Sequence, residues 1–232
     1  MKQQTIKTAL IKSLPVMAGY VVLGIGFGMV LENNGYGIWW AFAMSTFIYA
    51  GSMQYVTVSL LTAGEFLIST ALTTLMVNAR HLFYGISMID KYKGSGKKKL
   101  YLIFALTDET YSLVCQDDCP EGMDYHTLCM YISLFDQIYW VAGSLIGAAL
   151  GAVIPFDTTG VDFSMTALFV TVFVEQWLST KNHIPALMGL LASALCLILF
   201  GSSNFLIPSM IAITVLLAFG RKKIEKEEEK NA

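Results

Sequence analysis

Ionisable side chains that interrupt long apolar stretches are the residues of this sequence best suited to bind or move a solute. An ionisable group near the centre of a membrane helix costs roughly 2.5–3.5 kcal/mol on insertion scales. Each such group therefore needs an internal partner, a water-filled path or a position close to the interface. The sequence contains no metal-binding His and Glu pair, no Gly-x-Ser-x-Gly motif and no Walker A phosphate loop, so neither an enzyme nor a cofactor is predicted. The residues concerned are Arg80, His81, Asp108, Glu109, Asp136 and Glu175.

The two basic residues lie in the segment NARHLFYG, Asn78 to Gly85. On a continuous helix, Arg80 and Tyr84 share one polar stripe, while Asn78 and His81 belong to the adjoining stripe. We expect these four side chains to line a substrate-binding or transport path, with Arg80 binding a carboxylate or neutralising an internal acid. His81 is suited to carry a proton near neutral pH. The alternative is that Arg80 lies near the membrane surface and extends toward lipid headgroups.

Three acidic residues are predicted to serve in coupling or gating. Asp108 and Glu109, in the segment LTDETY, interrupt a short apolar stretch. We expect one of them to pair with Arg80 and the other to act as the coupling or gating group; the alternative is an exposed amphipathic segment with solvated carboxylates. Asp136 lies in the first turns of the next apolar run, where aromatic neighbours leave a position among the headgroups open.

The uncharged run from Ile38 to Gly64 has a polar centre, AGSMQ, which combines a helix-loosening glycine with a hydroxyl and an amide. We predict a break in the helix at Gly51–Gln54, with Gly51, Ser52 and Gln54 on the transport path, because broken helices offer backbone groups to a substrate. The alternative is a close contact between helices, which small residues favour in membranes.

A similar polar centre is predicted 123 residues later, where Glu175 and Gln176 correspond to Ser52 and Met53. We place Glu175 and Gln176 on the same transport path at the same depth. Lys181 lies just beyond them, which keeps a position at the interface open for Glu175.

Glycines recur at the same offset and indicate two repeat halves, 13–90 and 127–220. The halves have opposite orientation if residues 100–116 are re-entrant, and inverted repeats are a common architecture of secondary transporters. Chance alignment among 19 glycines is the alternative. The recurring positions are Gly24, Gly28 and Gly37, followed by Gly147, Gly151 and Gly160.

Composition places these residues in a membrane protein. Hydrophobic residues make up 55% of the 232 residues and charged residues only 14%, whereas a soluble domain carries about 25% charge. No basic stripe follows a helix, so no nucleic-acid partner is predicted. The lysine-rich N-terminus is interpreted as the flank of a retained first span and not as a cleaved signal peptide. The four cysteines show neither metal-binding spacing nor a disulfide pattern.

The apolar stretches predict an all-α polytopic membrane protein with seven to eight segments, some of them discontinuous or re-entrant, in a single transmembrane transport domain over residues 1–232. A span needs about 20 apolar residues. Residues 184–220 would make about 55 Å of helix, too long for a core about 30 Å thick, so we expect a break at Gly201–Asn204. The other segments are predicted at Ser13–Leu31, Ile38–Leu61, Phe66–Ile89, Leu100–Gln116, Thr127–Ile154 and Phe163–Thr180.

Basic clusters give conflicting indications of orientation. The dense run Lys91–Lys99 is expected on the cytoplasmic side, and so are the N-terminal lysines and Arg221–Lys223. Three predicted spans separate the first two clusters, which would place them on opposite sides. One of these predictions must therefore be wrong.

The segments AGSMQY, NARHLFYG and LTDETY, in this order, resemble the AzlC-like family, the large subunit of bacterial branched-chain amino-acid exporters. The resemblance extends best from about Ser13 to Pro155. It implies a multi-pass protein of the bacterial cell membrane that exports leucine, isoleucine, valine and methionine, driven by the proton gradient. It also implies a small hydrophobic partner, an AzlD-like subunit.

Two other functions remain open at this level: a channel or importer for another small solute, and a structural subunit of a transport complex. The loop from Cys115 to His126 is not part of the resemblance.

Overall fold

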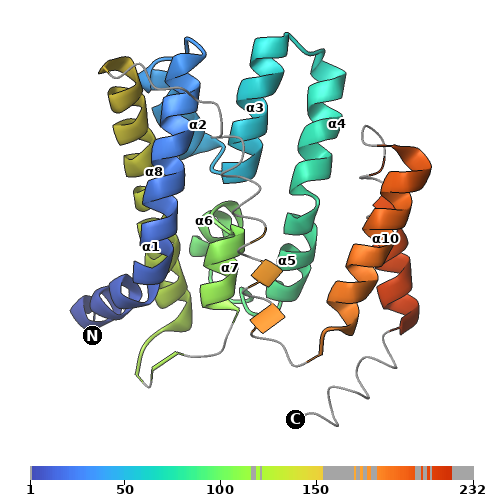
Figure 1. The fold of residues 1–232 in the computed structure, drawn as a ribbon. Coiled ribbons are helices and arrows are strands. Elements are labelled where there is room, and N and C mark those ends of the chain that lie inside the picture. Colours follow the sequence, from blue (N-terminus) through green and yellow to red (C-terminus); the bar gives the residue numbers. More distant parts are fainter. Residues whose placement is uncertain are drawn as a thin grey trace. The chain divides into compact units, whose positions relative to one another are not determined.

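The computed structural model describes residues 2–115, 119–120, 122–153, 170, 173–174, 177–178, 182–201, 205, 208–209 and 211–220. All regular secondary structure in these ranges is helical (Figure 1). The chain forms two compact units, Met1–Ser164 and Met165–Ala232. Each unit is described by itself.

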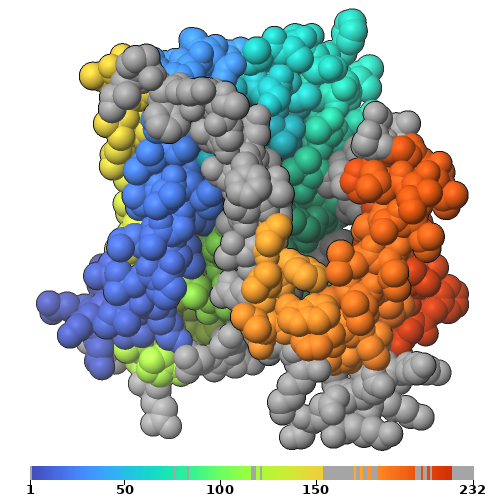
Figure 2. All heavy atoms as spheres, in the orientation of Figure 1, coloured from blue at the N-terminus to red at the C-terminus, as the bar shows by residue number. Residues whose placement is uncertain are grey.

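Two long helices form one side of the first unit. They are α1, Lys2–Asn33, and α8, Tyr125–Val153, and both are long and apolar enough to cross a membrane. Large apolar side chains remain exposed on them, including Val22 at 68% and Val153 at 80%. The side chains of α1 form a continuous column on the face of this unit shown in Figure 2. Such apolar outer surfaces are expected of helices in contact with lipid.

A third column consists of two helices in line, α4 at Leu67–Asn78 and α5 at Arg80–Met88 (Figure 1). Ala79 joins them with right-handed helical angles, φ −56° and ψ −29°, so the backbone direction is kept. Together they extend about 33 Å, enough to cross a hydrocarbon core about 30 Å thick. The predicted continuous helix over Phe66–Ile89 is thus one column with an irregular turn at Ala79.

Between α1 and α4, two short helices form a re-entrant hairpin and not the single crossing predicted for Ile38–Leu61. They are α2, Ile38–Phe47, and α3, Gly51–Ala63, about 15 and 20 Å long. The hairpin begins shortly after α1 ends, and Thr62 near its far end donates a hydrogen bond to Asn34 over 3.3 Å. Both outer ends therefore lie at the same end of the unit (Figure 1).

A second hairpin enters from the opposite end. It consists of α6, Lys98–Phe104, and α7, Asp108–Val114. The ammonium of Lys98 donates to the Thr127 hydroxyl over 2.6 Å, and the Tyr125 hydroxyl donates to the Val114 carbonyl over 2.6 Å. Both outer ends of this hairpin therefore lie beside the start of α8. The short segment is re-entrant, which is one of the two arrangements that its length allowed.

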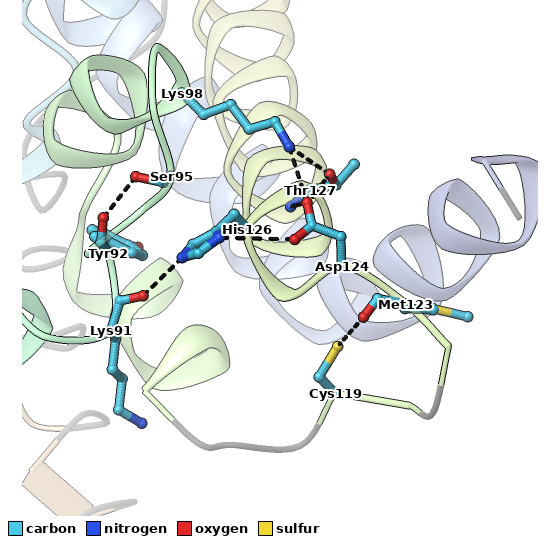
Figure 3. A network of polar contacts seen from close by, with 9 residues as sticks. All are labelled: Lys91, Tyr92, Ser95, Lys98, Cys119, Met123, Asp124, His126 and Thr127. Carbon is cyan, nitrogen blue, oxygen red and sulfur yellow. Dashed lines mark hydrogen bonds and ion pairs between the residues drawn. The ribbon is translucent and has the colours of Figure 1, made fainter.

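Polar contacts fasten the loop before α8 to the lysine-rich turn between α5 and α6 (Figure 3). His126 Nε2 lies 3.0 Å from the Lys91 carbonyl oxygen, and Lys98 donates to Asp124 Oδ2 over 3.0 Å. The backbone N–H of Thr127 also donates to Asp124, which thereby caps the first turn of α8. Hydrogen bonds from Thr127 and Lys98 lower the pKa of the Asp124 carboxyl from 3.8 to about 2.

Glycines determine how closely α1 and α8 approach. A Cβ atom added at Gly28 would lie 2.1 Å from the Ser144 carbonyl oxygen, and one at Gly147 would lie 2.0 Å from the Ile25 carbonyl oxygen. These backbones touch only because both residues lack a side chain, as in other small-residue contacts between membrane helices.

The two helices run parallel, because their contacts advance together along both chains. Gly24 faces Gly143, Gly28 faces Gly147, and Glu32 faces Gly151. An inverted repeat requires the first helix of each half to run in opposite directions, so this pair corrects the expected inversion. The recurring glycines Gly24, Gly28, Gly147 and Gly151 instead belong to one shared interface.

The second unit contains α10, Ile184–Phe200, and a helix at Ile211–Gly220. The helix α10 ends at Gly201, whose φ of +73° is readily adopted only by glycine. The helix thus ends at the first residue of the predicted break Gly201–Asn204, and residues 202–204 lie outside the described residues. Much of the predicted span Phe163–Thr180 lies outside the described residues, and the count of seven to eight segments is not confirmed.

If α1 and the α4–α5 column each cross a membrane, the hairpins remove the conflict between the basic clusters. The helices α2 and α3 return to the end they entered from, so two crossings would separate the N-terminus from Lys91–Lys99 and place both clusters on one side. By the positive-inside rule, we expect that side to be the cytoplasm.

This topology predicts the labelling of single cysteines in a cysteine-free background. Gln3→Cys and Lys93→Cys should react with an impermeant maleimide only after the cytoplasmic face is opened. Glu65→Cys, in the turn between α3 and α4, should react from outside in intact cells. Labelling of Gln3→Cys and Lys93→Cys from opposite sides would refute the re-entrant path of α2 and α3.

The glycine interface predicts that two alanine substitutions in α1 differ strongly in their effect on stability. Gly28→Ala should lower the stability of the detergent-solubilised protein by about 1–3 kcal/mol, because the backbones must separate. Gly19→Ala is the matched control, since a Cβ there meets nothing within 4 Å. Thermal unfolding measures both; equal midpoints for the two variants would contradict the close contact.

Candidate functional site

The starts of three helices meet around one guanidinium group. The helix α3 begins at Gly51, α5 at Arg80 and α7 at Asp108. Arg80 Nη2 donates to the Ser52 hydroxyl over 2.6 Å, and Arg80 Nη1 lies 2.6 Å from Asp108 Oδ2. One cation therefore connects the two hairpins, which enter from opposite ends.

The ion pair between Arg80 and Asp108 shows which of the two neighbouring acids, Asp108 or Glu109, is the partner of Arg80. Its side chain is 29% exposed and that of Asp108 is 15% exposed, so the pair is mostly withdrawn from the surface. Among the described residues, the acid that forms an ion pair with Arg80 is Asp108, while Glu109 accepts a hydrogen bond from Tyr20. A charge-assisted pair of this kind is stronger than a neutral hydrogen bond.

Backbone strain marks the first break, which lies at residues 48–50, immediately before the predicted position Gly51–Gln54. Tyr49 has φ +47°, a left-handed angle that is unfavourable for a bulky residue and costs about 1–3 kcal/mol. Its ring is 3% exposed and lies 6.2 Å from the ring of Phe104, on the opposite hairpin. Burial of the ring offsets the strained turn.

Gly51 and Gln54 lie within the first turn of α3 and face α8. A Cβ atom at Gly51 would lie 3.0 Å from the Trp140 ring, so the glycine makes room for the indole. Gln54 is fully buried, accepts from the Trp140 indole N–H over 2.9 Å and donates to Ser45 over 3.2 Å. The close-contact alternative therefore describes Gly51 well, while a role of both residues in a transport path stays a prediction.

A second polar network adjoins the first and includes two of the predicted acids. The Tyr20 hydroxyl donates to Glu109 over 2.7 Å and lies 2.6 Å from the Thr107 hydroxyl. Thr107 donates to Thr110 over 3.0 Å, and Thr110 donates to Asp136 over 2.8 Å.

Asp136 lies inside the first unit and not on its surface. It lies eleven residues after Tyr125, the first residue of α8, and is fully buried. Sequence reasoning overlooked Tyr20 and Thr110, because Tyr20 is 87 residues from Thr107. The one local signal was Thr107 ahead of Asp108 and Glu109, a helix N-cap pattern that the structure forms.

A pocket of about 360 Å³ lies beside the junction and is bordered by all three breaks. Tyr49 and Ala50 come from the first break, Ala79 from the second and Leu106 from the third. The other polar and charged residues on its wall are Asn78, His81, Tyr92 and Lys99. The remaining wall is mostly apolar and includes Ile48, Leu75, Leu82, Gly85, Met88, Ile89, Ile103 and Phe104.

The remaining predicted residues divide into three cases. His81 Nδ1 lies 3.1 Å from the Asn78 carbonyl oxygen, beside the pocket. Tyr84 stacks on Tyr111 with ring centroids 4.7 Å apart, away from the pocket wall. Glu175 and Gln176 lie outside the described residues.

In the part of the chain that the structure describes, no group of His, Cys, Asp and Glu side chains could hold a metal ion.

Broken helices that meet inside an apolar bundle, around a bridged cation and beside a pocket, are the architecture of a membrane transport protein. The family model described as AzlC protein matches residues 15–154, which contain the whole junction. The chain belongs to the AzlC protein family, a family of transport proteins rather than of enzymes.

Three relatives extend the similarity over most of the chain. The branched-chain amino acid transport protein AzlC of Bacillus subtilis is 45% identical over 216 residues, 93% of this chain and 85% of that protein. An uncharacterized membrane protein of Haemophilus influenzae is 41% identical and covers 94% and 89% of the two chains. The inner membrane protein YgaZ of Escherichia coli is 27% identical, covering 78% and 77%. No solved structure matches.

The Arg80–Asp108 contact predicts energetic coupling between these two residues. Arg80→Gln and Asp108→Asn should each lower the thermal stability in detergent, and the double variant should lose less than the sum, with a coupling of about 1–3 kcal/mol. Additive losses would show that the pair contributes nothing.

The pair formed by Lys98 and Asp124 supplies an internal reference for this measurement. It is separated by 3.0 Å, but its side chains are 36% and 56% exposed. Its coupling should be about 0–1 kcal/mol, as for other surface pairs. The two cycles compare similar contact distances in different surroundings.

Proposed function

We propose that this chain is the large, multi-pass subunit of a branched-chain amino-acid exporter of the bacterial cell membrane. It exports leucine, isoleucine, valine and methionine, is coupled to the proton gradient and acts with a small AzlD-like partner. The observation that carries the proposal is the junction itself: Arg80, held between Ser52 and Asp108, beside an apolar pocket. The name of the Bacillus subtilis relative supports the substrate class.

The junction suits the two ends of an aliphatic amino acid. A guanidinium binds a carboxylate with two parallel hydrogen bonds, so the substrate carboxylate can replace Asp108 at Arg80. Once released, Asp108 is an acceptor for the substrate ammonium. The substrate side chain then enters the adjoining pocket, where Leu75, Leu82 and Ile103 offer apolar contacts.

The pocket predicts breadth among aliphatic substrates. Its volume of about 360 Å³ exceeds the size of a single branched side chain. One methylene group in an apolar pocket discriminates by only about 1–3 kcal/mol. Valine and leucine should therefore both be accepted, with affinities that increase with the buried apolar area.

Apolar outer faces give the partner subunit a surface to bind. Along α4 and α5, Leu67 is 84% exposed, Leu72 53% and Ile86 67%. A small hydrophobic subunit would cover such a face by close packing, as other membrane helices do.

Reconstitution in proteoliposomes with the partner tests the proposal. Preloaded leucine should drive counterflow of labelled leucine, and isoleucine, valine and methionine should compete, while lysine and glutamate should not. In cells, deletion of the gene should raise intracellular isoleucine after feeding an isoleucine dipeptide. Absence of counterflow for every branched-chain amino acid, together with unchanged isoleucine efflux, would refute the proposed function.

A pocket-filling variant separates the binding site from the fold. Gly85→Leu should lower leucine counterflow by about tenfold or more, because Gly85 lines the pocket and a Cβ there meets nothing within 4 Å. Gly19→Leu is the matched control, because Gly19 is also in a helix and also unobstructed but does not line the pocket. Equal activity of the two variants would exclude this pocket as the site.

A further inference from the structure

Two carboxyl groups in the first unit are joined by an unbroken series of hydroxyl groups. From Glu109 the series passes through Tyr20, Thr107 and Thr110 to Asp136, with successive distances of 2.7, 2.6, 3.0 and 2.8 Å. The three hydroxyls come from α1, from the turn before α7 and from α7 itself. The series thus bridges α7 and α8 through the middle of the unit.

Asp136 lies at the enclosed end of this series. It is fully buried, and its Oδ1 atom has no hydrogen-bond partner among the described residues. Among the described residues, the groups facing it are the Thr110 hydroxyl, Glu109 and the phenols of Tyr49 and Tyr101, and none of these is a cation. Burying an ionised carboxylate without a cation costs several kcal/mol, so this site favours the neutral acid.

Glu109 lies at the other end, beside the ion pair. Among the described residues, the groups facing it are Tyr20, Asp108 and Arg80, and Tyr49, Tyr84 and Asp136 also interact with its charge. If a substrate carboxylate replaces Asp108 at Arg80, Asp108 is left as a second negative charge beside Glu109. Like charges close together favour protonation of one member. Events at Arg80 therefore bear directly on the proton at Glu109.

The hydroxyls already point in one direction over most of the path. Thr107 donates to Thr110, and Thr110 donates to Asp136. Thr107 can also accept from Tyr20, because an oxygen with two lone pairs accommodates both Tyr20 and the Thr110 N–H. Only the Tyr20 proton must turn, from Glu109 to Thr107, to align the whole series.

We propose that Glu109 and Asp136 are the two proton-carrying groups of the transporter and that Tyr20, Thr107 and Thr110 relay the proton between them. The inference rests on the proposed proton-coupled export. In the forward step Glu109 gives its proton to Tyr20, each hydroxyl passes its own proton onward, and Asp136 receives one. Each hydroxyl ends with one proton, and only O–H bonds are broken and formed.

Transport in proteoliposomes tests the relay with two readouts from one preparation. Thr110→Val and Tyr20→Phe should lower leucine transport driven by a pH gradient by about tenfold or more, the scale of lost proton transfer. Leucine counterflow at equal pH, which needs no net proton movement, should stay within about twofold of wild type. Thr110→Ser keeps the hydroxyl and should restore gradient-driven transport.

Matched controls remove hydroxyls that bond only to backbone carbonyls. They are Thr57→Val, whose hydroxyl donates to the Met53 carbonyl, and Tyr55→Phe, whose hydroxyl donates to the Leu23 carbonyl. Both should keep gradient-driven transport. Three results would overturn the relay: an equal loss of both readouts in Thr110→Val, no loss in either readout, or wild-type transport driven by a sodium gradient instead. None of them would contradict branched-chain transport by the wild-type protein.

A measurement that needs no transport keeps the two proposals separate. Infrared spectra of the purified protein near neutral pH should show the carbonyl band of a protonated carboxyl group. Asp136→Asn should remove the component of the band that belongs to Asp136, and Thr110→Val should shift that component by removing the hydrogen bond. Absence of the band in the wild-type protein would overturn the relay, whereas absence of branched-chain counterflow would overturn the proposed function alone.

Discussion

The contact of Arg80 with Ser52 and Asp108 is the interaction on which the centre of the first unit depends. Three helices start there, and a helix start leaves backbone N–H groups without intrahelical acceptors. In a bilayer no surrounding water satisfies such groups, so interrupted helices persist only where protein encloses them. The guanidinium of Arg80, at the start of α5, contacts Ser52 in one hairpin and Asp108 in the other. It thereby holds the three helix starts together inside the protein.

The parallel pair of α1 and α8 supplies the rigid side against which this junction forms. Direct backbone contact at Gly28 and Gly147 leaves little freedom to slide. From that pair, Tyr20 reaches the turn before α7, and Trp140 reaches Gln54 in α3. Each hairpin is therefore attached both to the α1–α8 pair and, through Arg80, to the other hairpin. A change at Arg80 can reach α8 by either route.

In the proposed function, the same geometry would join recognition of a carboxylate to movement of a proton. Arg80 is paired with Asp108, which we propose a substrate carboxylate replaces, and the next residue in the chain, Glu109, begins the series of hydroxyls. Exchange of one ion-pair partner alters the charge beside Glu109 without a large displacement of the backbone. The strained turn at Tyr49 borders the same pocket, so energy stored there is available where a substrate would bind.

The sequence by itself determined the membrane class, the interrupted helices, the end of α10 at Gly201 and the pairing of Arg80 with a nearby acid. These follow from composition, glycine and the cost of a lone charge, which are local properties. Only the tertiary structure decided that Asp108 is the partner, that the break falls at Tyr49, that residues 38–63 turn back, and that α1 and α8 run parallel. Hydropathy reports how apolar a segment is but not which way the chain leaves a break. That direction depends on contacts between distant residues, such as Thr62 with Asn34 and Tyr20 with Thr107, which no spacing along the chain reveals.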